Sequence, residues 1–135
     1  MELADTSAWT NRHKSDDVDG DFSTRILDDE IATCPMVTME LLWTAQSLQD
    51  FEELLVDLAA LPQVPINDDV WLRAAEVWRE LVALGRHRQV KIPDLLVAAA
   101  AEREGLAVCH YDHDFEAIAA VTGQAIRAIA PLGSL

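Results

Sequence analysis

Short apolar segments alternate with helical patterns along nearly the whole chain, and this alternation restricts the fold more than any other feature of the sequence. Strand-like segments are predicted at residues 3–4, 33–37, 106–109 and 125–129. Residues with the apolar spacing of helices separate them. Because neighbouring parallel strands are joined by long crossover connections, usually helices, this order predicts an α/β fold. We expect a mostly parallel sheet with helices on both faces.

Capping residues predict where several helices begin. Thr38 is placed to cap a helix that carries Glu40, and Ser47 with Asp50 has the spacing of a capping box. Asn67 precedes a long helix. These residues place three helix starts in the middle of the chain.

Other segments are predicted from polarity and from proline. The polar segment at residues 15–20 is predicted to be a loop, followed by a helix that extends to Ile31. Pro62 and Pro65 confine any strand between them to a sheet edge, because a proline has no N–H to donate to the ladder. Asp112 is predicted to begin the last helix.

Length and composition favour one domain over residues 1–135, because half of the residues are hydrophobic and can form one sizeable core. No apolar run of about 18 residues and no signal-peptide pattern occurs, so we expect a soluble, cytoplasmic protein without a membrane segment. Cys34 and Cys109 lie in short apolar stretches. Two isolated cysteines match neither a zinc site nor a disulfide framework, which predicts reduced core residues.

The formal net charge of −14 excludes the overall basic field that drives ordinary nucleic-acid binding. A polyanionic partner would need bound cations, a local basic patch, or both. The only candidate patch consists of Arg86, His87, Arg88 and Lys91. The alternative interpretation of this segment is a solvated loop.

Four acidic residues stand where an apolar segment meets a polar one: Asp5, Glu40, Asp94 and Asp112. Each could simply cap a helix or complement its dipole. However, the carboxyl ends of parallel strands gather at one edge of a sheet, so the four carboxylates can converge. Converging carboxylates repel one another unless protons or a hard divalent cation neutralise them. The set therefore predicts a metal pocket.

The segment at residues 108–115 carries the densest polar chemistry in the chain. Asp112 and Asp114 could both face a metal, as could His110 or His113. Zinc prefers thiolate or imidazole ligands in tetrahedral number, whereas oxygen ligands favour Mg²⁺ or Mn²⁺. The excess of carboxylates therefore predicts Mg²⁺ or Mn²⁺.

Together these segments resemble a PIN domain, and specifically a VapC-type toxin ribonuclease of bacterial toxin–antitoxin pairs. The resembling segments, residues 3–8, 39–41, 92–99 and 112–115, span almost the whole chain. The resemblance implies a three-layer α/β/α sandwich whose parallel sheet has the order 3-2-1-4-5, with the proline-bracketed strand at an edge. It also implies a set of metal-site residues, with the last as an auxiliary: Asp5, Glu40, Asp94, Asp112 and Asp114.

The activity implied by this resemblance is that of a metal-dependent endoribonuclease, the toxin of a type II pair. Its partners would be RNA, a VapB-type antitoxin and a second copy of the chain. His110 and Tyr111 depart from the Thr or Ser and basic residue that commonly precede the last acid of the family. Two alternatives are a catalytically silent PIN-like binding module and a receiver-like phosphoacceptor domain, although the acidic pair and lysine of a receiver are missing.

Overall fold

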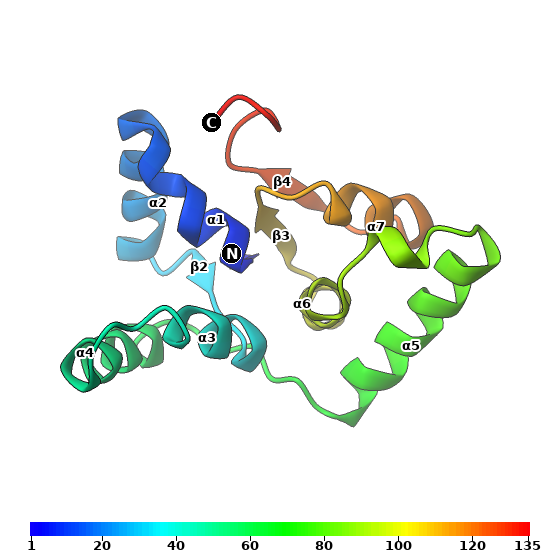
Figure 1. The fold of residues 1–135 in the computed structure, drawn as a ribbon, viewed down its shortest axis with the longest axis horizontal. Helices are drawn as coiled ribbons and strands as arrows, with labels where there is room; N and C mark the ends of the chain where they lie inside the picture. The colour runs from blue at the N-terminus through cyan, green and yellow to red at the C-terminus, as the bar shows by residue number, and fades with distance from the viewer.

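The computed structural model describes residues 1–135 and contains four short strands: β1 (Glu2–Ala4), β2 (Ile31–Ala32), β3 (Ala107–His110) and β4 (Ile126–Ala128). Their order in the sheet is β2-β1-β3-β4, and every neighbouring pair is parallel. The predicted parallel α/β arrangement is therefore confirmed (Figure 1). The strand predicted at residues 33–37 is wrong, because β2 ends at Ala32 and helix α3 (Pro35–Leu42) begins within this segment. The helix predicted to extend to Ile31 ends at Leu27, so that Ile31 belongs to β2.

The edge strand expected between the two prolines is reduced to one parallel bridge, between Thr33 and Gln63. The Thr33 N–H donates to the Pro62 carbonyl at 3.0 Å, and the Val64 N–H donates to the Thr33 carbonyl at 2.8 Å. Pro62 has no N–H to extend the ladder backward, and Pro35, which begins α3, has none to extend it forward. The bridge occupies the outer position beside β2, which agrees with the expected order 3-2-1-4-5.

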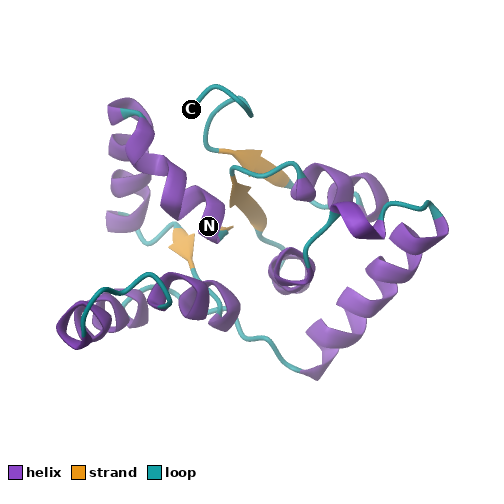
Figure 2. Cartoon of the chain, in the orientation of Figure 1, coloured by secondary structure: helices purple, strands orange, loops and turns teal.

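Seven helices connect and cover these strands (Figure 2). They are α1 (Thr6–Asn11), α2 (Asp16–Leu27), α3 (Pro35–Leu42), α4 (Leu48–Ala59), α5 (Asp68–Ala83), α6 (Ile92–Arg103) and α7 (Asp114–Thr122). Two short 3₁₀ turns lie at Arg12–Lys14 and His87–Gln89. None of the helices combines the length and hydrophobicity needed to cross a membrane.

The alternation of strand side chains divides the core into two parts, one on each face of the sheet. The larger part, with residues from α3 to α7, receives Leu3, Ala32 and Val108. The smaller part, with α1 and α2, receives Ala4, Ile31 and Cys109. Helices thus cover both faces, and the predicted α/β/α sandwich is confirmed.

Helix α6 is buried on all sides, because every residue from Asp94 to Ala101 is buried. It contacts β1, β3, α5 and α7. A helix that is apolar around its whole circumference belongs in the interior. The small alanine side chains of this segment allow the neighbouring elements to approach closely. Gly105, with φ +68°, then turns the chain from α6 into β3.

Two predicted helix starts are confirmed by capping bonds. Ser47 Oγ accepts the Asp50 N–H at 3.0 Å, and Asn67 Oδ1 accepts the Val70 N–H at 3.1 Å. Helix α2 corrects the loop predicted at residues 15–20, since Ser15 caps it and acidic residues fill its first turn. Negative side chains at that end complement the helix dipole, so the polarity of the segment is that of a helix start.

Helix α3 begins at Pro35 and not after Thr38, so Thr38 is not its cap. A proline is favoured at the first helical position, where its missing N–H has no intrahelical partner to lose. Helix α7 begins at Asp114 and not at Asp112. Asp112 Oδ1 instead accepts the Asp114 N–H at 2.9 Å, in the turn that precedes the helix.

Cys34 and Cys109 are free thiols that are completely buried, as predicted. Burial raises the pKa of Cys34 to about 11 and the pKa of Cys109 to about 12. Because the thiolate is the reactive form, we expect neither thiol to react with a disulfide reagent in the native protein at pH 8. A colorimetric thiol assay with this reagent should detect both cysteines after unfolding in urea. Rapid reaction of either cysteine in the native protein would contradict their burial.

Candidate active site

Three carboxylates meet at the carboxyl edge of the sheet. Asp94 is the third residue of α6, Asp112 follows β3, and Asp114 is the first residue of α7. Each offers one oxygen to a group whose atoms all lie within 4.8 Å of one another. The predicted convergence of Asp94 and Asp112 is thus present. Asp114, predicted as an auxiliary, lies in the same cluster.

The turn that carries Asp112 is held from within. His110 Nδ1 accepts the Asp112 N–H at 3.1 Å. The buried His110 ring packs on Phe115, with 5.1 Å between the ring centroids. His110 therefore supports the turn, and His113 instead pairs with Glu116 at the surface. Neither histidine belongs to the group of converging metal-ligand atoms.

Asp5 ends β1 and caps α1. Its Oδ2 accepts the backbone N–H of Ser7 at 2.9 Å and the Ser7 hydroxyl at 2.6 Å. The same hydroxyl accepts the Tyr111 N–H at 2.9 Å, which ties the end of β1 to the residue before Asp112. Asp5 is only 3% exposed, and its Oδ1 has no hydrogen-bond partner. One oxygen of this carboxylate thus stays free beside the cluster.

Glu40 lies outside the 4.8 Å cluster and joins the site through α1. It is the sixth residue of α3, in the second helical turn and not in the first turn as predicted. Its Oε1 accepts the Thr6 hydroxyl at 3.0 Å. Thr6 directly follows Asp5, so the bond brings Glu40 to the same edge of the sheet.

The acids influence one another electrostatically. Burial raises the pKa of Asp5, and the charge of Asp112 adds to this effect. Burial also raises the pKa of Asp94, as do the adjacent Asp114 carboxyl group and the charge of Asp5. The pKa of Glu40 is raised by burial and by Asp5. Asp5 therefore interacts electrostatically with acids on α3, on α6 and in the turn after β3.

Lys91 is the member of this site that the sequence did not indicate. Its ammonium Nζ lies 2.9 Å from Asp112 Oδ2, 3.0 Å from Asp114 Oδ2 and 3.5 Å from Asp94 Oδ2. Burial acts to raise the pKa of Asp114, but hydrogen bonds from Asp94 and Lys91 hold it below the ordinary value. The sequence predicts Lys91 as part of a surface basic patch. It does not indicate the contact with the acids, because Asp112 and Asp114 lie 21 and 23 residues away along the chain.

The donor set fits a hard divalent cation. The cluster contains only carboxylate oxygens. Oδ1 of Asp5 and Oδ2 of Asp94 are buried without a hydrogen-bond partner, although the Lys91 ammonium lies 3.5 Å from the latter. Unpaired buried carboxylate oxygens are costly unless a cation or proton compensates them. Cys109 is excluded as a metal ligand, because it lies in the smaller core, between the sheet and helices α1 and α2. Oxygen ligands match Mg²⁺ or Mn²⁺ better than zinc.

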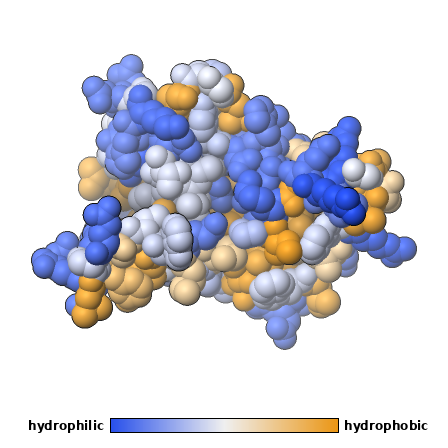
Figure 3. All heavy atoms as spheres, viewed as in Figure 1, coloured by the Kyte–Doolittle hydropathy of each residue, from blue (hydrophilic) through white to orange (hydrophobic).

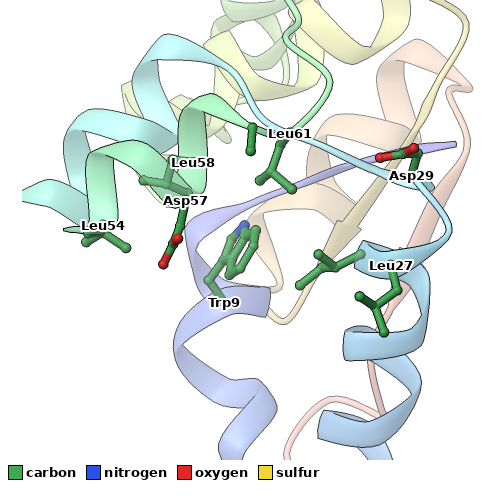
Figure 4. Close-up of a pocket in the computed structure, with 9 residues that line it drawn as sticks. Trp9, Leu27, Asp29, Leu54, Asp57, Leu58 and Leu61 are labelled. Atoms are coloured by element: carbon green, nitrogen blue, oxygen red, sulfur yellow. The ribbon is translucent and has the colours of Figure 1, made fainter. Parts of the chain in front are cut away.

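An apolar concavity, lined by none of these acids, lies between α1, α2 and α4 (Figure 4). Apolar side chains form most of it, including Trp9, Ile26 and Leu54, and Asp29 and Asp57 also line it. Figure 3 shows further apolar atoms at the surface around α4 and α5. Seven of its nine lining residues are hydrophobic, so its surface is mostly apolar.

The profile of the PIN domain matches residues 3–121. Over 133 residues the chain is 40% identical to Ribonuclease VapC18 of Mycobacterium tuberculosis, covering 97% of this chain and 96% of that relative. Its fold is similar to DNA-bound VapBC from Salmonella typhimurium, with TM-score 0.75, 20% identity and 96% and 100% of the two chains covered. It is also similar to VapBC-5 of M. tuberculosis, a member of the VapBC family of toxin–antitoxin systems, with TM-score 0.60, 26% identity and coverage of 94% and 95%. The chain therefore belongs to the PIN domain family.

Proposed function

We propose that this protein is a metal-dependent endoribonuclease and the toxin of a type II toxin–antitoxin pair. The observation that carries the proposal is the meeting of Asp94, Asp112 and Asp114 within 4.8 Å, with Asp5 coupled to them at the same sheet edge. A relative that matches almost the full chain is named a ribonuclease. The receiver-like alternative is not supported, because the chain belongs to the PIN family.

We assign Asp5 and Asp94 as the principal metal ligands, because each has a buried oxygen without a hydrogen-bond partner. Asp112 and Glu40 would complete the site and orient the attacking water, and Asp114 would support them. A bound Mg²⁺ or Mn²⁺ supplies Lewis-acid activation of water and neutralises charge on the phosphate. The metal identity is part of the proposal.

Other residues of the chain prepare the site for this chemistry. Ser7 holds Asp5 in one orientation and links it to Tyr111. Arg86 and Arg88 are exposed and form no ion pair, so they can attract RNA phosphates. A chain with a net charge of −14 needs such local cations to approach a polyanion.

Cleavage of RNA in the presence of Mn²⁺ tests the proposal. The purified protein should produce fragments with 5′-phosphate and 3′-hydroxyl ends, EDTA should stop the reaction, and excess Mn²⁺ should restore it. Undiminished cleavage in EDTA would refute metal dependence. Absence of cleavage of total cellular RNA in Mn²⁺ would favour the silent PIN-like binding module.

The antitoxin partner belongs to the same proposal. The apolar concavity between α1, α2 and α4 suits the apolar face of a partner segment, and Asp29 and Asp57 suit basic side chains on it. VapBC-5, similar in fold, is described as a member of a toxin–antitoxin family. We propose that a VapB-type antitoxin occupies this concavity, that the protein acts in the cytoplasm, and that it forms a homodimer.

A further inference from the structure

The ammonium group of Lys91 lies inside the carboxylate cluster and uses the oxygens that a metal would need. It donates to Asp112 Oδ2 and Asp114 Oδ2 and lies 3.5 Å from Asp94 Oδ2. All three acids of the 4.8 Å group are therefore within ion-pair distance of one lysine. A monovalent cation of the chain itself already compensates the cluster.

The backbone and the side chain of Lys91 are held differently. The backbone N–H donates to Asp114 Oδ2 at 3.0 Å, in the extended residue that precedes α6. The side chain is 62% exposed, and its flexible stem has several rotatable bonds. The ammonium can therefore leave the cluster by side-chain rotation while the backbone remains bound to Asp114.

An ammonium and a divalent ion cannot share these oxygens. Both cations prefer the charged carboxylate oxygens, and their charges repel each other strongly at distances of a few ångströms. Metal binding at the cluster consequently requires the ammonium to move out. The apparent metal affinity is then reduced by the fraction of molecules in which the ammonium occupies the cluster.

We propose that Lys91 is a tethered competitor of the metal: its ammonium occupies the Asp94, Asp112 and Asp114 cluster and is displaced when a divalent ion binds. The inference rests on the metal site of the proposed function and adds its regulation. Lys91 preserves the cluster at low metal concentration, because it supplies a counter-charge to three neighbouring carboxylates. It also sets the metal concentration at which the site fills.

Titration calorimetry with MnCl₂ tests this on the full chain. Lys91→Met retains a stem of similar length and the backbone N–H but removes the charge. We expect it to bind Mn²⁺ about tenfold more tightly than the parent if the ammonium occupies the cluster about 90% of the time. Lys91→Arg keeps the charge and should bind no more tightly than the parent. Arg88→Met removes an equal charge from a nearby exposed residue that has no ion pair, and should shift the affinity much less.

Thermal melting provides a readout that is independent of catalysis. In EDTA, Lys91→Met should melt below the parent, because three carboxylates lose their counter-charge, and Mn²⁺ should raise its melting temperature more than that of the parent. Equal or weaker Mn²⁺ binding by Lys91→Met would overturn the competition while leaving the nuclease proposal intact. An equal change of Mn²⁺ affinity in Lys91→Met and Lys91→Arg would also overturn the proposed competition. Absence of Mn²⁺ binding by every variant and the parent would overturn the metal site itself.

Discussion

Asp94→Asn is expected to abolish RNA cleavage and leave the protein folded. Asp94 is 4% exposed, and its Oδ2 has no hydrogen-bond partner among the converging acids. Asparagine has nearly the same shape but carries no charge and presents one fewer oxygen to a metal. We expect a loss of at least about a hundredfold, the scale seen when one preorganised electrostatic group is removed from an active site. The rate of RNA cleavage in Mn²⁺ is the measurement.

Asp69→Asn is a matched control for this variant. Asp69 also lies in the first turn of a helix, but it is exposed and pairs with Arg103 at the surface. Loss of an exposed ion pair changes stability by about 1 kcal/mol or less. This control should cleave RNA like the parent. Equal cleavage by Asp94→Asn and the parent, with contaminating nuclease excluded, would remove Asp94 from the proposed site.

Although Asp94→Asn should lose activity, it should not lose stability at pH 8 in the absence of metal. Because burial and neighbouring acids raise the pKa of Asp94, the folded state disfavours its ionised form. Its contribution to stability is complete below the ordinary pKa of an aspartate and is lost as the pH rises through the raised value. In EDTA at pH 8, the variant should therefore melt at or above the temperature of the parent. This advantage should shrink as the pH falls toward 4.

Phe22→Ala is expected to produce the largest loss of stability, about 3–5 kcal/mol, by leaving a cavity in the core. Phe22 is 1% exposed and packs in the smaller core with Ala4, Ile31 and Cys109. Its ring meets Trp9 edge to face with 4.9 Å between centroids, and the Arg12 guanidinium lies 4.5 Å from its ring centroid. These contacts attach α2 to the sheet. Urea unfolding monitored by circular dichroism measures the loss.

Phe51→Ala makes the same chemical change at an exposed position of α4. Because it creates no buried cavity, we expect it to cost far less than Phe22→Ala. A similar loss for both variants would mean that Phe22 does not anchor α2. Neither residue belongs to the carboxylate cluster, so any activity lost by Phe22→Ala should follow the unfolded fraction.

The sequence predicted most of the fold because the signals for its elements are local. Asn67 and Ser47 cap the helices that follow them, as their spacing indicated. The errors occurred where two local signals competed. Pro35 began a helix three residues before Thr38, and Ser15 capped a helix within a segment that looked like a polar loop. In both segments the helix-start residue, a proline in the first turn or a serine cap, outweighs the competing signal.

The positions of the acids at strand ends and helix starts follow from residue types and spacing, and the parallel topology gathers those positions at one edge of the sheet. Residue types and spacing do not predict which side chains contact the acids or hold them in place. Ser7 reaches Tyr111 across 104 residues, and Lys91 reaches Asp114 across 23 residues. The Ser7 contact forms because α1 packs beside β3. The Lys91 contact forms because α6 and α7 pack together beside the sheet, and this packing places a lysine among the three carboxylates.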